Sequence, residues 1–232
     1  MELKREISIW GILFASISAI IGSGWLFGSL YAAQMAGPAA IFSWIIGGVV
    51  VIFLAFCFAE LATMFPVAGA IGVFSLHSHG KSVSFLVSFL AWVAFVIISP
   101  IEVQAVIQYS ANYLPDLIQQ TGETPKLSML GFFVAFLLLL LLALVNSKSV
   151  KFMSQTNFFV TIWKIFVPVL AVILFLASPK HMENLTKFGG FAPYGATGVF
   201  SSLAVGGIIL AFNGFQPGVA LAGETKNPQK TI

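Results

Sequence analysis

An uncharged apolar run from Ile7 to Ala33 restricts the fold of this chain more than any other stretch. About 20 apolar residues are enough for a helix to cross a bilayer. Gly22, Ser23 and Gly24 stand near the centre of the run, and glycine weakens a helix by about 1 kcal/mol relative to alanine. A helix that opens there frees backbone N–H and C=O groups, which a membrane tolerates only where protein or a water-filled cavity receives them. We therefore predict a membrane-spanning helix that is broken at residues 21–24.

The rest of the chain is also built of apolar segments. Of its 232 residues, 59% are hydrophobic and only 8% are charged, whereas soluble domains carry about 25% charged residues. The first run is far longer than the apolar region of a signal peptide, which has roughly 7–15 residues. We predict an all-α polytopic membrane protein with six transmembrane helices. These helices are expected at residues 7–33, 39–65, 83–113, 128–145, 156–177 and 198–222.

The basic residues of the connections predict the orientation, because lysine and arginine accumulate in short cytoplasmic loops. With the N-terminus inside, seven basic residues fall on the inner side and three on the outer side. The inner residues are Lys4, Arg5, Lys81, Lys148, Lys151, Lys226 and Lys230, and the outer residues are Lys126, Lys180 and Lys187. We expect a multi-pass protein of the cell membrane with a cytoplasmic N-terminus. Because the basic residues are spread over several loops, no nucleic-acid partner is expected.

A second interruption lies near residues 211–217, where an asparagine, two glycines and a proline break an apolar segment. Gly24 with Gly28, and Gly214 with Gly218, also fit the GxxxG pattern of helix packing. Each interruption therefore has two interpretations, packing and binding. Interrupted helices in corresponding positions of two halves point to a transporter binding site, so the pairing favours binding.

Several motifs carry a resemblance to a known family. Two motifs lie at the interruptions: Gly22-Ser23-Gly24 followed by Trp25-Leu26-Phe27-Gly28, and the later Phe212-Asn213-Gly214-Phe215. They resemble the two broken helices of amino acid permeases of the amino acid–polyamine–organocation (APC) superfamily. Lys226-Asn227-Pro228-Gln229 resembles the segment that follows the second of these helices. The resemblance implies the first repeat of a LeuT-like inverted-repeat transporter fold plus the first helix of the second repeat. The chain is then expected to be a fragment of a twelve-helix protein, with the C-terminal half of the transporter as its missing partner.

The resemblance also implies a substrate site at the two breaks. Backbone N–H groups around Ser23 and Gly24 would receive the carboxylate of an amino acid. Carbonyl groups near Ile20, Leu210 and Asn213 would receive its ammonium, and Phe212 would close over it as an aromatic gate. The implied substrate-binding residues all lie at one of the two breaks: Ile20, Gly22, Ser23, Gly24, Leu210, Phe212, Asn213 and Gly214.

Two ionisable residues inside the predicted spans are candidates for proton coupling. A charge at the bilayer centre costs at least about 2.5–3.5 kcal/mol and marks a functional candidate. Lys164 resembles a lysine of sodium-independent family members, in which the ammonium takes the place of a sodium ion against helix 1. Glu102 follows Pro100, whose kink could turn the carboxyl toward a substrate amine or a proton path. Lys164 could instead extend back to the inner surface, and Glu102 could be a hydrogen-bonded packing residue.

Together these features predict secondary active transport of an amino acid, coupled to protons. An amino acid or amine exchanger and a non-transporting membrane scaffold subunit remain alternatives. An intramembrane hydrolase is not expected, because no histidine lies in a predicted span to act as a base or metal ligand. We therefore expect no enzymatic activity, no cofactor and no metal. The expected partners are an amino acid, protons and membrane lipid.

Overall fold

The computed structural model describes residues 5–67, 69–120, 125–147, 150–179, 181–187 and 189–232. The chain divides into two compact units, one made of Met1–Ser78 with Phe158–Ile232 and the other of His79–Asn157. Helices α4 and α6 pass from one unit into the other. Each unit is described by itself below.

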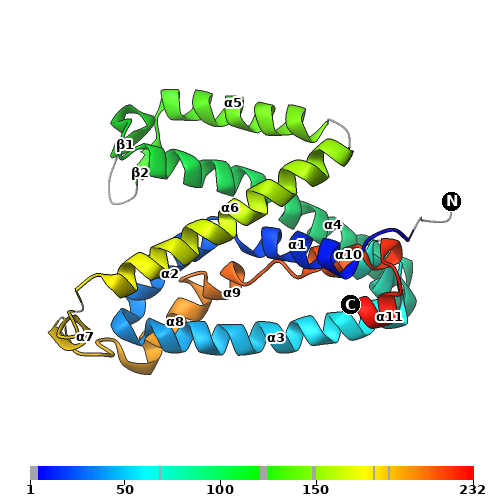
Figure 1. Cartoon of the computed structure of the whole chain (residues 1–232), viewed down its shortest axis with the longest axis horizontal. Coiled ribbons are helices and arrows are strands. Elements are labelled where there is room, and N and C mark those ends of the chain that lie inside the picture. Colours follow the sequence, from blue (N-terminus) through cyan, green and yellow to red (C-terminus); the bar gives the residue numbers. More distant parts are fainter. Residues whose placement is uncertain (1–4, 68, 121–124, 148–149, 180, 188) are drawn as a thin grey trace. The chain divides into compact units, whose positions relative to one another are not determined.

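The first unit contains most of the helices (Figure 1). Its elements are α1 (Ile9–Ile20), α2 (Gly24–Ala36), the 3-10 turn η1 (Gly37–Ala39), α3 (Ala40–Met64), the start of α4 (Ala70–Ser110), most of α6 (Val150–Ala177), α7 (Asn184–Lys187), α8 (Gly195–Ala204), α9 (Ile208–Ala211), α10 (Gln216–Ala220), η3 (Ala222–Glu224) and α11 (Pro228–Thr231). Helix α8 packs against α2 and α3, α9 packs against α2, and α10 packs against α1. Small buried residues such as Ala32, Gly47 and Gly198 let these backbones approach closely.

A buried pair of serines joins α3 to α8. The Ser43 hydroxyl donates to the Val199 carbonyl at 2.9 Å, and the Ser202 hydroxyl lies 2.7 Å from the Ser43 oxygen and 2.8 Å from the same carbonyl. Both serines are fully buried. A buried hydroxyl is costly unless it is hydrogen-bonded, so this network holds the two helices in one register.

The predicted spans and the observed helices differ where glycines interrupt them. By length and composition, four stretches of the described residues could cross a membrane: Gly24–Met64, Ile71–Ser110, Met129–Asn146 and Phe158–Ala177. The first of these contains both α2 and α3, joined at η1, where Gly37 has a φ of 62°. The expected first and sixth spans are divided into helices shorter than the roughly 20 residues that a bilayer needs, so length alone does not identify them. The count of six spans stays a prediction.

Helix α4 begins earlier than the sequence predicts. The expected span starts at residue 83 after a loop, but the helix starts at Ala70 and runs to Ser110 with one non-helical residue, Gly80 (φ 80°, ψ −175°). Such a φ is strained for any residue with a Cβ. The expected loop is therefore reduced to a kink at one glycine, and His77 and His79 lie on helical backbone.

The second unit adds one short pair of strands to a chain that is otherwise mostly helical, as predicted. It contains the rest of α4, η2 (Pro115–Leu117), an antiparallel pair of strands β1 (Ile118–Gln120) and β2 (Pro125–Leu127), α5 (Met129–Asn146) and the start of α6. The Ser128 hydroxyl accepts the Gly131 N–H at 2.9 Å and donates to the Asp116 carbonyl at 2.6 Å, which caps α5 and fixes it to η2. Two short paired strands thus occupy part of the stretch between the expected third and fourth spans.

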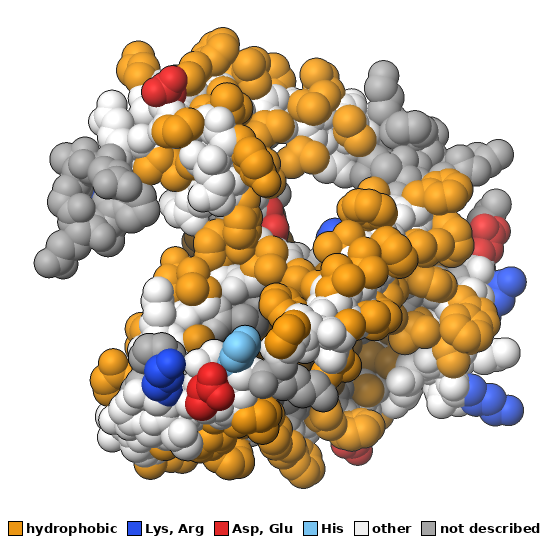
Figure 2. Space-filling model, turned by 60° about the vertical axis from the view of Figure 1, so that its left-hand side comes forward, with side chains coloured by type: hydrophobic (Ala, Val, Ile, Leu, Met, Phe, Trp, Pro, Cys, Tyr) orange, Lys and Arg blue, Asp and Glu red, His pale blue; other side chains and the backbone are white. Residues whose placement is uncertain are grey.

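Hydrophobic side chains cover most of the visible surface, and charged side chains are few and scattered (Figure 2). Most of the large apolar residues of α3, α5 and α6 are exposed, as lipid-facing residues are. Cys57, which its apolar context favours as a core residue, is exposed. Three of the basic residues used to predict the orientation, Lys4, Lys148 and Lys180, lie outside the described residues.

Candidate functional site

The first break separates α1 from α2. Helix α1 ends at Ile20, and Ile21 leaves helical geometry with φ −83° and ψ 84°. The Gly22 N–H then donates to the Ile20 carbonyl at 3.0 Å, and α2 restarts at Gly24 with Ser23 as its N-cap. The first N–H groups and the last C=O groups of a helix have no partner within that helix. The break therefore presents both kinds of backbone group within a few residues.

The sixth predicted span is interrupted twice. Helix α8 ends at Ala204 and α9 starts at Ile208, after Gly207 adopts a φ of 78°. Residues 212–215 then separate α9 from α10. The second interruption falls within the predicted one, whereas the break at Gly207 was not predicted. The Leu210 carbonyl accepts the Asn213 N–H at 3.0 Å across the second interruption.

The two breaks lie against each other. A Cβ at Gly214 would be 2.5 Å from the Ile20 backbone nitrogen and 2.8 Å from the Ala19 carbonyl carbon. A Cβ at Gly24 would be 3.3 Å from the Ala211 Cα. Helix α9 accordingly lies between α2 and α3 in Figure 1, and α10 packs against α1. Residues almost 200 positions apart in the sequence are thus joined by backbone-to-backbone contact.

The glycines of both GxxxG patterns take part in this contact. Besides Gly24 and Gly214, Gly28 faces Trp44 and Ala211 at 3.6–3.7 Å from its would-be Cβ, and Gly218 faces Ser16 at 3.0 Å. The packing interpretation therefore applies to these glycines. It does not compete with binding, because the same close packing brings the backbone groups of the two breaks together.

Phe212 lies on the face of α3. Its ring makes an edge contact with Trp44, with centroids 5.3 Å apart. The would-be Cβ of Gly48 lies 3.4 Å from the end of the Phe212 ring, and that of Gly47 lies 3.5 Å from the same ring. The ring therefore occupies a notch that two glycines make. Sequence reasoning assigned no site role to Trp44 or Gly48, although paired glycines within an apolar helix were a visible signal.

Asn213 is exposed at the second break. Its side-chain oxygen accepts a hydrogen bond from the Gln216 side-chain amide. This contact joins the break to the first turn of α10. Gln216 was not singled out from the sequence, although its spacing of three from Asn213 would allow such a pair.

Lys164 contacts the end of α1. Its ammonium nitrogen donates to the Ser18 carbonyl at 3.1 Å, and the side chain is half-buried. Ser18 lies in the last turn of α1, where carbonyls lack partners within the helix and the helix dipole favours a cation. Ser18 precedes Ile20, the last residue of α1, by two positions. Lys164 therefore lies beside the first break.

The remaining candidate, Glu102, belongs to the second unit, where it is half-buried on α4 two residues after Pro100. Its proposed role stays a prediction. The predicted residues at the two breaks, together with Lys164, all lie in the first unit. Among the described residues, no three His, Cys, Asp or Glu side chains gather in a way that could hold a metal ion.

These features define a class of protein: a mostly helical multi-pass membrane protein in which two interrupted helices meet at their breaks. The sequence matches the Amino acid permease family over residues 7–232. The chain therefore belongs to the amino acid permeases of the APC superfamily.

Three relatives illustrate the similarity. The chain is 39% identical over 234 residues to the glutamate/serine transporter AimA of Bacillus subtilis, covering 100% of this chain and 43% of AimA. It is 37% identical over 231 residues to the aspartate-proton symporter of the same organism, covering 100% of this chain and 44% of the symporter. It is 27% identical over 246 residues to the gamma-aminobutyric acid permease of B. subtilis, covering 99% of this chain and 48% of that permease. The chain spans about half the length of the curated relatives it matches.

Proposed function

We propose that this chain forms the N-terminal half of a secondary active transporter that moves an amino acid across the cell membrane. In this proposal six helices span the membrane, the N-terminus is cytoplasmic, and the fold is LeuT-like. The substrate binds where the broken first and sixth spans meet. The family membership and the helices that are long and apolar enough to cross a membrane support this proposal.

The contact between the two breaks is the observation that carries the proposal. Gly214 lies directly on the Ile20 backbone, and Gly24 lies on Ala211. Helix N-termini attract anions, and unwound carbonyls with helix C-termini attract cations. An amino acid carries both charges on one carbon, so it fits a place where both kinds of backbone group meet. In the proposal, backbone N–H groups around Ser23 and Gly24 bind the carboxylate, while carbonyls near Ile20 and Leu210 bind the ammonium.

The substrate class follows from the relatives. Proteins 39% and 37% identical to this chain are named as transporters of glutamate and serine and of aspartate. A site made of backbone groups recognises the common part of amino acids and leaves selectivity to other residues. We therefore propose an acidic or small polar amino acid as the substrate.

Proton coupling is the proposed energy source, with Lys164 and Glu102 as its candidates. One relative is named as a proton symporter. Lysine can lose its proton where arginine cannot, and the Lys164 ammonium contacts α1 through Ser18. Loss of that charge would release α1, so that a proton could move with each transport cycle. Glu102 is proposed as a second, separate candidate for carrying a proton.

The test is uptake of radiolabelled glutamate, aspartate and serine by the whole protein in proteoliposomes, with and without a pH gradient. Competition by N-acetylglutamate and by glutamate α-methyl ester tests the two halves of the site. Hydrogen bonds to charged groups contribute about 1.5–3 kcal/mol, so each derivative should compete about 10- to 150-fold less well than glutamate. Equal competition by either derivative would contradict the proposed binding mode, and uptake that requires an internal amino acid would identify an exchanger.

A further inference from the structure

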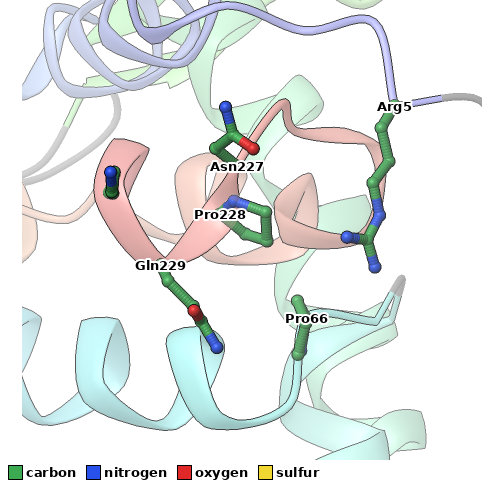
Figure 3. A pocket seen from close by; sticks show the side chains of 6 residues that line it. Arg5, Pro66, Asn227, Pro228 and Gln229 are labelled. Carbon is green, nitrogen blue, oxygen red and sulfur yellow. The ribbon is translucent and has the colours of Figure 1, made fainter.

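A basic pocket lies where the chain enters α1 and leaves η3. It has a volume of about 340 Å³. Figure 3 shows Arg5 reaching from the N-terminal stretch toward Pro66, which follows the end of α3, with Pro228 facing them across the space. The lining residues come from three separate parts of the first unit: Arg5, Pro66, Asn227, Pro228, Gln229 and Lys230.

Backbone hydrogen bonds fix the walls of this pocket. The Ile7 N–H donates to the Glu224 carbonyl at 3.0 Å, and the Lys226 N–H donates to the Ile7 carbonyl at 2.9 Å. The Thr231 hydroxyl donates to the Lys226 carbonyl at 2.7 Å. Asn227 turns the chain with a φ of 48°. Arg5 and Lys230 are therefore brought to one pocket by a paired backbone, although they are 225 positions apart in the sequence.

The chemistry of the lining favours an anion. Arg5 and Lys230 supply two positive charges, and the side-chain amides of Asn227 and Gln229 supply further N–H donors. None of the described residues that line the pocket is acidic. The planar guanidinium of arginine pairs with phosphate through two parallel hydrogen bonds. The pocket volume of about 340 Å³ is larger than one phosphate group needs.

The position of the pocket favours a phosphate at the membrane surface. Pro66 comes two residues after Met64, the last residue of the apolar stretch Gly24–Met64 that is long enough to cross a bilayer. In the proposed topology, the pocket lies where a spanning helix leaves the hydrocarbon. Basic pockets and clusters at the cytoplasmic ends of membrane helices attract anionic lipid headgroups.

We propose that this pocket binds a phosphate-bearing anion, either the headgroup of an anionic lipid or free phosphate. The bound phosphate would join the entry to α1, the segment after η3 and the end of α3. It would therefore hold the ends of both interrupted helices together. This inference concerns a second site; it rests on the proposed membrane topology and not on the proposed transport.

The test measures binding by native mass spectrometry of the whole protein in detergent, titrated with phosphatidylglycerol, phosphatidylcholine or inorganic phosphate. The variants are Arg5→Gln, Lys230→Gln and the double variant. Lys226→Gln is the matched control, because Lys226 is an exposed lysine of the same segment that does not line the pocket. The melting temperature of each variant without ligand shows that it is folded.

Each of the two pocket charges should contribute about fivefold to the affinity for phosphatidylglycerol. The double variant should therefore bind phosphatidylglycerol about 25-fold more weakly than the wild type. The affinity of Lys226→Gln should be close to that of the wild type. Inorganic phosphate should compete for the site. A lipid as the source predicts much tighter binding of phosphatidylglycerol than of inorganic phosphate, and free phosphate as the source predicts similar affinities. Equal loss in Lys226→Gln, unchanged affinity in the double variant, or binding of neither phosphatidylglycerol nor phosphate would overturn the proposal.

Discussion

Replacing Gly214 with alanine should separate the two breaks. The new Cβ would lie 2.5 Å from the Ile20 backbone nitrogen and 2.8 Å from the Ala19 carbonyl carbon. Non-bonded heavy atoms prefer about 3.5–4.0 Å, so the two backbones must move apart by about 1 Å. A side chain could rotate away, but a backbone nitrogen in the last turn of α1 cannot.

The expected size of the effect follows from the cost of overpacking, which is about 1–3 kcal/mol. If this cost appears in substrate binding, affinity should fall by about 5- to 150-fold. The assay is the binding of labelled substrate to the purified whole protein, together with its thermal unfolding. Gly28→Ala is the matched control, because its new Cβ would face Trp44 and Ala211 at an ordinary 3.6–3.7 Å.

A third substitution makes the reasoning quantitative. The would-be Cβ of Gly24 lies 3.3 Å from Ala211, between the values for Gly28 and Gly214. Loss of affinity should therefore increase in the order Gly28→Ala, Gly24→Ala, Gly214→Ala. Wild-type affinity and stability in Gly214→Ala, or an effect of Gly28→Ala as large, would refute the close contact between the breaks.

Three further predictions concern other contacts. Lys164→Met and Lys164→Arg should both lose uptake driven by a pH gradient even where substrate binding survives; an arginine variant with the wild-type pH dependence would show that the lysine is only an anchor. Ser43→Ala should lower the free energy of unfolding by about 0.5–1.5 kcal/mol in chemical denaturation, because one net hydrogen bond of the α3–α8 network is lost, and an unchanged value would mean that the network does not stabilise the fold. In a background where exposed Cys57 is replaced by alanine, a cysteine at Lys226 should react with an impermeant reagent only from inside and one at Glu183 only from outside; the reverse pattern would overturn the predicted orientation.

The family and the membrane character could be predicted from the sequence because both depend on local patterns. Long uncharged runs, and glycine motifs such as Gly22-Ser23-Gly24, are visible without any knowledge of tertiary contacts. Helix boundaries were less predictable. The left-handed conformation of Gly207 and the single-residue kink at Gly80 depend on backbone angles that composition does not specify.

The partners of the site residues could not be predicted, because they come from distant parts of the chain. Lys164 donates to the backbone carbonyl of Ser18, 146 positions away. Every residue type has the same backbone carbonyl, so the type of residue 18 does not indicate this contact. The notch that receives the Phe212 ring requires Gly47 and Gly48 on a helix whose register only tertiary packing determines. Sequence patterns thus indicated which residues are unusual, and the structure was needed to show what each of them faces.

The close contact between the breaks changes how substitutions at these glycines should be interpreted. The sequence allows two interpretations of the interruptions that contain Gly24 and Gly214, helix packing and ligand binding. In the structure each of them packs against backbone of the opposite break, so a larger side chain at either position disturbs packing before it reaches any ligand. Loss of binding in such a variant is therefore expected under both interpretations and cannot separate them. Removing a charge from the ligand leaves the packing intact, so the derivatives of glutamate, and not the glycine variants, decide whether the exposed backbone groups bind the substrate.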